Sequence, residues 1–246
     1  MKKKIVVLAA LLWAIGGACM AQSVLQNVYR CYVYKDMQTW KQIIDSLEAL
    51  PTLSEQQRAE LLNAEYGYVA WRLSKDYQDK KEAEQYLDKA YAQLERLPNE
   101  GKHVSQIAAY HGAFIGYQIA ISPMKAPFIG LKSLRYVKEA VATDSTNYFA
   151  YIQYGNVLYY MPAMFGGSKK EAVVKYLKAK ELMLQQDVHQ NNWLYMNLLL
   201  TLADAYKKNQ DWQSVKGCYD EALQLQPDYP YITQKLYPTL QQNLEK

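Results

Sequence analysis

The side chains that could bind a metal ion are few in this chain. Its three histidines are His103, His111 and His189, and none belongs to a His-Glu-x-x-His segment or to a Cys/His cluster at metal-ligand spacing. His103 and His111 are eight residues apart, about two helical turns, which is too far for both rings to bind one ion. We therefore expect surface histidines and no structural metal.

The motifs of common catalytic sites are also missing from the sequence. It has no Gly-x-Ser-x-Gly elbow, phosphate-binding glycine loop or dinucleotide fingerprint. Acidic pairs such as Glu82 and Glu84 are typical of any solvated helix face. We therefore predict that the chain is not an enzyme and uses no cofactor. This reasoning leaves open a catalytic site assembled from distant helices.

The composition favours a binding role without nucleic acid. Half of the 246 residues are apolar, and 23 are Tyr against only 4 Phe, so a substantial core can form. Basic residues exceed acidic ones by 28 to 24, but three of them are Lys2, Lys3 and Lys4. The rest of the chain is nearly neutral and lacks the clustered basic face that nucleic acid requires.

Those lysines begin a segment, residues 1–21, with the pattern of a signal peptide. The apolar run from Ile5 to Ile15 is too short to span a bilayer, which takes about 20 residues, and small residues lead up to Ala21. We expect cleavage after Ala21 and an exported, periplasmic protein with no transmembrane segment. The alternative is a lipoprotein acylated at Cys19, although Gly16 stands where such signals usually carry Leu.

From Gln22 onward the chain is predicted to be all-α. Apolar residues recur at helical spacing in segments separated by short polar or Pro/Gly breaks, without sustained alternation. The clearest unit has Leu199, Leu202, Ala203 and Tyr206 on one helix. It continues with Val215, Tyr219 and Ala222 on the next helix and ends at Pro227.

This spacing resembles the tetratricopeptide repeat (TPR), in which small residues let neighbouring helices approach. Earlier units fit with longer connections, because the alanines Ala90, Ala140, Ala179 and Ala222 are 50, 39 and 43 residues apart. Gly67, Gly116 and Gly155 take the small position on the first helix of each unit. The excess residues fall partly in turns within the pairs, at Pro123 to Gly130 and Pro162 to Gly167. The segment Met161 to Ala172, with its MFGG turn, also resembles secreted bacterial TPR proteins, including one associated with some periplasmic solute transporters.

The resemblance implies one domain over residues 22–246, a TPR-like superhelix of about five helix pairs plus a C-terminal capping helix. Cys31 and Cys218 would lie in its first and last pairs, out of reach of a disulfide. The inner face of such an array is lined by fixed positions on the first helix of each pair, and here these are rich in aromatics. The predicted partner or ligand contacts are Tyr68, Trp71, Tyr110, Tyr117, Phe149, Asn156 and Tyr159.

Two interpretations of this face stay open, because its tyrosines could equally form a filled core. The first function is a non-catalytic scaffold in the bacterial periplasm, binding a protein or peptide partner through the aromatic face. The alternative is a ligand-binding accessory component of a periplasmic transport system, with an apolar small molecule as ligand. An enzyme is the third interpretation.

The signal peptide is tested by N-terminal sequencing of the exported protein. We expect the mature chain to begin at Gln22. A chain that keeps Met1, or one that starts far from Gln22, would contradict the cleavage site. A blocked, lipid-modified cysteine at the N-terminus would favour acylation at Cys19 instead.

Overall fold

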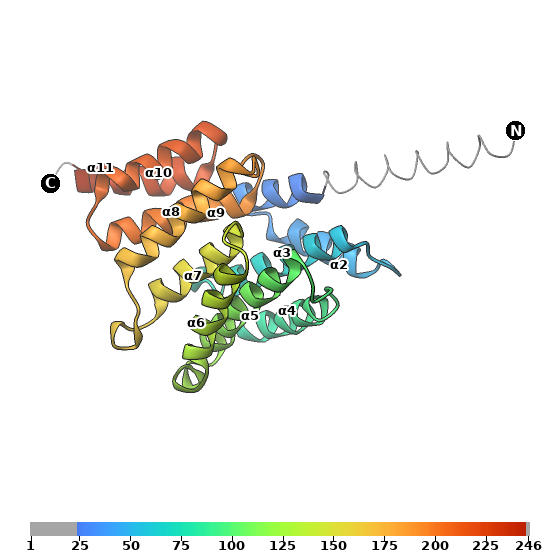
Figure 1. The fold of residues 1–246 in the computed structure, drawn as a ribbon. Helices are drawn as coiled ribbons and strands as arrows, with labels where there is room; N and C mark the ends of the chain where they lie inside the picture. The colour runs from blue at the N-terminus through green and yellow to red at the C-terminus, as the bar shows by residue number, and fades with distance from the viewer. Residues whose placement is uncertain (1–23, 245–246) are drawn as a thin grey trace, which may run out of the picture.

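The computed structural model describes residues 24–244, and every regular element in that range is a helix (Figure 1). This confirms the all-α prediction. The signal peptide at residues 1–21 and the acylation of Cys19 lie outside the described residues. The main helices are residues 24–34, α2 (Met37–Glu48), α3 (Glu55–Arg72), α4 (Lys80–Leu94), α5 (Lys102–Ile121), α6 (Ala126–Thr143), α7 (Tyr148–Tyr160), α8 (Lys169–Gln185), α9 (Trp193–Lys208), α10 (Trp212–Leu225) and α11 (Tyr237–Leu244).

Consecutive helices pack in pairs, α3 with α4, α5 with α6, α7 with α8 and α9 with α10. With residues 24–34 and α2 in front and α11 behind, the described part of the chain holds the five pairs and the terminal helix expected. One apolar core runs through the array from Val28 to Leu240. None of the described helices has the length and apolarity to cross a membrane. The assignment to the TPR family stays a prediction.

The helix starts follow local sequence signals. Ser54 forms a capping box with Gln57, as its spacing predicts, and the Ser168 and Asp211 side chains accept backbone N–H groups at the starts of α8 and α10. Between α7 and α8, Gly166 has a φ of 96°, a left-handed conformation that favours glycine. The other long turn is shorter than expected, since α6 already begins at Ala126 and includes Gly130.

The small residues place the helices close together, with one correction. The four alanines of the repeat are completely buried, and a Cβ on Gly155 would overlap the Tyr176 ring of α8. Gly116, however, has no atom within 4 Å of its Cβ position, whereas a Cβ on Gly112 would lie 2.5 Å from Val137. The expectation that Gly116 packs against its partner helix is wrong, because α5 and α6 approach one turn earlier.

The two ends of the array meet. Tyr29 Oη donates to Gln226 Oε1 at 3.1 Å, Tyr34 Oη donates to Asp228 Oδ2 at 2.7 Å, and Asn197 Nδ2 donates to Tyr32 Oη at 3.2 Å. The first helix therefore packs against α9 and the segment after α10. The sequence argument against a disulfide assumed an open array with Cys31 and Cys218 at its opposite ends. That assumption does not hold, because the ends meet, but both cysteines are buried and unpaired.

The meeting point is a cluster of rings around Trp193, at the start of α9. Its indole Nε1 donates to Asn63 Oδ1 on α3 at 2.7 Å. Its ring centroid lies 5.2 Å from that of Trp40 and 5.8 Å from that of Tyr32. A Cβ on Gly67 would come within 2.7 Å of Trp40 and 2.8 Å of Trp193, so only glycine lets both indoles lie on α3.

Two glycine substitutions test which glycine allows close contact between paired helices. Gly155→Ala should lower the free energy of unfolding by about 1–3 kcal/mol, since the added methyl group overlaps Tyr176. Gly116→Ala is the matched control, and it should raise that free energy by about 0.4–1 kcal/mol because its site is open and helical. Urea denaturation of both variants measures the difference. Equal effects would contradict the assignment of Gly155 to the close contact.

Candidate functional site

The seven predicted contact residues divide into two groups by burial. Tyr68, Tyr110 and Phe149 are buried, with 2–6% of their surface exposed. Trp71, Tyr117, Asn156 and Tyr159 are half-buried. The inner face of the array is therefore filled along much of its length, and only part of the predicted set can meet a ligand without rearrangement.

The filled region is centred on Tyr66, which sequence reasoning missed. Its ring lies 5.3 Å from those of Tyr117 and Phe149, 6.0 Å from that of Tyr110 and 6.2 Å from that of Trp193. The Tyr110 and Phe149 rings are 4.4 Å apart. These aromatic contacts join α3, α5, α7 and α9 into one core.

The polar groups within this core satisfy one another. Tyr176 Oη donates to Asn156 Oδ1 at 2.8 Å, and Asn156 Nδ2 donates to Gln153 Oε1 at 3.1 Å. Gln153 Nε2 then donates to Tyr66 Oη at 2.9 Å. Asn156 is thus part of an internal hydrogen-bond chain from α8 to α3, which fixes its side chain.

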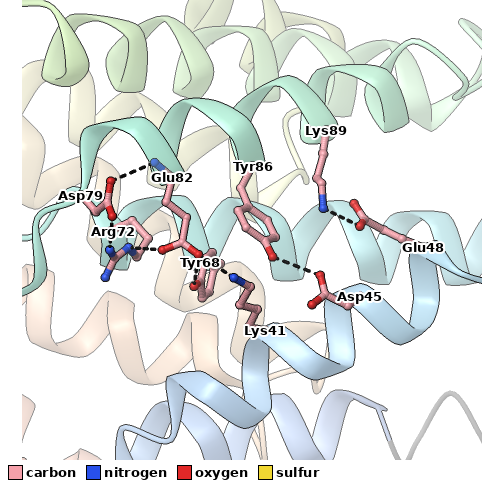
Figure 2. A network of polar contacts seen from close by, with 9 residues as sticks. All are labelled: Lys41, Asp45, Glu48, Tyr68, Arg72, Asp79, Glu82, Tyr86 and Lys89. Carbon is pink, nitrogen blue, oxygen red and sulfur yellow. Dashed lines mark hydrogen bonds and ion pairs between the residues drawn. The ribbon is translucent and has the colours of Figure 1, made fainter.

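Tyr68 points away from this core, toward the polar network of α2, α3 and α4 (Figure 2). Glu82 lies at the centre of the network. It accepts a hydrogen bond from Tyr68 Oη at 3.1 Å and pairs at 2.8 Å with both Lys41 and Arg72. Burial alone would raise the pKa of Glu82, but Lys41, Tyr68 and Arg72 together hold it below the ordinary value. Glu82 therefore stays ionised and binds three helices together.

The same network continues toward Glu48, which pairs with Lys89 at 2.6 Å, while Tyr86 Oη donates to Asp45 at 3.1 Å (Figure 2). Glu65, near Glu48, is a completely buried carboxyl group without a hydrogen-bond partner of good geometry. Burial raises the pKa of Glu65 to about 9, the nearby Glu48 carboxylate raises it further, and Lys89 opposes them. Glu65 is therefore protonated at neutral pH.

The half-buried aromatics lie at the carboxyl ends of the first helices of the pairs, where the turns begin. Trp71 stacks beside Tyr77 with centroids 5.3 Å apart. Tyr159 and Tyr160 have centroids 4.9 Å apart, and Tyr160 has 76% of its surface exposed.

Lysine side chains also lie along this edge, near aromatic rings. Lys207 of α9 pairs with Asp204 at 2.9 Å and lies 5.5 Å from the Tyr219 ring centroid. Burial lowers the pKa of Lys207, but Tyr219 and Asp204 outweigh it and raise the pKa above the ordinary value. Lys207 therefore remains a cation.

The other end of this edge is formed where the chain ends meet. Lys35 Nζ lies 3.9 Å and Lys235 Nζ 5.6 Å from the Tyr231 ring centroid, at a hollow of 210 Å³. Lys235 also lies 3.9 Å from Asp76, next to Tyr77. We call the whole set the tyrosine rim. It comprises Trp71, Tyr77, Tyr117, Tyr159, Tyr160, Tyr231, Lys35, Lys207 and Lys235.

The rim offers aromatic faces for stacking and ammonium groups for anions, and no histidine. His103 is buried, so the expectation of surface histidines is wrong for this residue, whose ring nitrogens lie at hydrogen-bond distance from Gln106 and Glu55. His111 stacks on Tyr136, and His189 lies near Asp187. Among the described residues there is no group of three or more His, Cys, Asp or Glu that could hold a metal ion. Rings and ammonium groups of this kind can bind a flat, partly apolar anion through non-covalent contacts.

Comparison with known proteins adds one finding. No protein-family model matches the chain, and no curated protein matches it in sequence. Among solved structures it is similar to the HusA haemophore from Porphyromonas gingivalis, with a TM-score of 0.50 and 18% identity over 74% of this chain and 92% of that one. The likeness is one of fold.

The buried carboxyl makes stability depend on pH. The pKa of Glu65 is higher in the folded than in the unfolded chain, so the folded protein keeps this carboxyl group protonated. The stability that this protonation contributes is lost as pH rises from about 4.5 toward 9. Glu65→Gln removes that loss. We expect the free energy of unfolding of the variant to exceed that of the wild type by about 2 kcal/mol at pH 8 and by much less at pH 5. Urea unfolding at the two pH values measures this difference. Glu84→Gln, at an exposed site on α4, is the control. A pH-independent difference would contradict this assignment.

Proposed function

We propose that this chain is an exported, non-catalytic protein that binds a flat, apolar, anionic small molecule at the tyrosine rim, as an accessory component of a periplasmic transport system. The observation that carries the proposal is the set of half-buried and exposed aromatic rings of the rim, together with its three lysines. A planar ligand can stack on such rings while its acidic groups pair with the ammonium ions.

The fold likeness supports one ligand class. The similar solved structure is described as a haemophore, and haem is a flat, apolar macrocycle with two carboxylates, which matches the chemistry of the rim. We therefore choose haem as the first probe. The burial of Tyr68, Tyr110 and Phe149 supports a small ligand at the rim better than an extended protein partner along the inner face.

The rim predicts how haem would be held. Since no histidine belongs to it, affinity would depend on stacking and ion pairing more than on a histidine–iron bond. Iron-free protoporphyrin should therefore bind within about threefold of haem, which is less than 1 kcal/mol. A much weaker affinity for the iron-free ring would show that the iron needs a ligand from this chain.

Titration of the protein with haem, followed by absorbance and by quenching of tryptophan fluorescence, tests the site. Tyr160→Ala should weaken binding about tenfold through loss of a stacking face. Lys207→Gln should weaken it by a similar factor, and less so at high salt. Phe128→Ala, which removes an exposed aromatic outside the rim, is the matched control. The proposal fails if the wild type does not bind haem or protoporphyrin, or if Phe128→Ala alone weakens binding.

A further inference from the structure

Two turns of the array carry large apolar side chains that nothing in the described chain covers. Met124 has 86% of its surface exposed and Phe128 has 87%, both at the turn between α5 and α6. Met164, in the turn between α7 and α8, has 83% exposed. Leu131 and Phe165 extend the two groups. We call Met124, Phe128, Leu131, Met164 and Phe165 the apolar lip.

The two turns project from the same edge of the molecule (Figure 1). Each is built to stand out from its helices, because η2 (Pro123–Lys125) and η3 (Ala163–Phe165) are short 3₁₀ turns that begin after a helix end. Apolar side chains at such tips contribute no burial to the fold, and a partner that removes them from water would gain that free energy.

The charges around the lip are mostly basic. Between Ser122 and Thr143 the charged residues are Lys125, Lys132, Arg135 and Lys138, with Glu139 the one acid. From Ser145 to Ala172 they are Lys169, Lys170 and Glu171. The chain beyond residue 21 is close to neutral, so this bias is local. It complements a negatively charged surface.

We propose that the apolar lip docks this protein on the surface of a lipid bilayer that carries anionic headgroups. Convex apolar tips can enter the boundary between headgroups and acyl chains without a preformed groove, while flanking Lys and Arg side chains pair with phosphate groups. A protein partner would instead need a recess to receive two separate tips. This docking is independent of the ligand proposed for the tyrosine rim.

Flotation with lipid vesicles tests the docking. The chain from Gln22 to Lys246 is used in every variant, so that neither the basic and apolar segment 1–21 nor acylation of Cys19 contributes. The vesicles are phosphatidylcholine alone and phosphatidylcholine with about one third phosphatidylglycerol. We expect the protein to float with the anionic vesicles and to be released by high salt.

The variant Met124→Ser/Phe128→Ser/Met164→Ser should bind anionic vesicles at least about tenfold more weakly. The matched control is Leu25→Ser/Leu50→Ser/Leu184→Ser, which removes exposed apolar side chains outside both turns and should bind like the parent. Lys132→Gln/Arg135→Gln should reduce binding to anionic vesicles selectively. Circular dichroism and the haem titration, run on the same samples, separate loss of folding or of ligand binding from loss of docking.

Three results would overturn the proposal. The first is no difference in flotation between the lip variant and the parent chain, including absence of flotation in both. The second is an equal loss in the control variant. The third is sedimentation showing that the parent self-associates and the lip variant does not, since the lip would then be a contact between copies of the chain.

Discussion

The packing of Trp193 against Gly67 and Trp40 is the contact on which the architecture depends. It joins α9 to α3, with Trp193 and Gly67 126 residues apart in the chain, and it brings Tyr32 and Tyr66 into the same cluster. Two indoles can lie on α3 at this point only because residue 67 has no side chain. Helix pairs that would otherwise follow one another in an open array are thereby turned back toward their beginning.

The contact between the two ends of the array limits which surfaces can bind a ligand or partner. With α3, α5, α7 and α9 joined around Tyr66, the inner face is occupied by the protein's own rings, and the hydrogen-bond chain from Tyr176 to Tyr66 satisfies the polar groups among them. Exposed aromatic and apolar surface then remains at the turn edge. There the rim has rings with cations, and the lip has methionine and phenylalanine with cations, so two neighbouring surfaces of one edge suit different kinds of contact.

Local signals in the sequence predicted local structure well. The capping residues Ser54, Ser168 and Asp211 start helices, and Ala90, Ala140, Ala179 and Ala222 are buried between them. Such features depend on residues a few positions apart. The side of α3 that faces inward was harder to predict, because Tyr66 and Tyr68 differ by about 200° around a helix and both are aromatic. Fixing the phase on the neighbouring glycine favoured Tyr68, whereas packing by Trp193 selects Tyr66.

The contacts that fill the inner face could not be predicted from repeat spacing at all. Spacing predicts how a pair packs on the next pair, but Trp193 to Asn63 and Tyr29 to Gln226 join elements that are 130 and 197 residues apart. The tyrosine rim also depends on contacts between distant parts of the sequence, because Lys35, Tyr231 and Lys235 come together only when the ends of the array meet. Trp71, Tyr117 and Tyr159 belonged to the predicted set because they occupy inner-face positions of the repeat, counted from Gly67, Gly116 and Gly155.

The joining of the first helix to the segment after α10 also orders events during synthesis. Residues 24–34 leave the ribosome early, whereas their partners Asn197, Asp228 and Gln226 follow the residues that they contact by 165, 194 and 197 positions. Until then Val28, Tyr29 and Tyr32 have no C-terminal surface to cover them, and contacts of such long range are slow to form. The nascent chain therefore carries an uncovered apolar helix through nearly all of its translation, and the final turn of the C-terminal pair is what completes the fold.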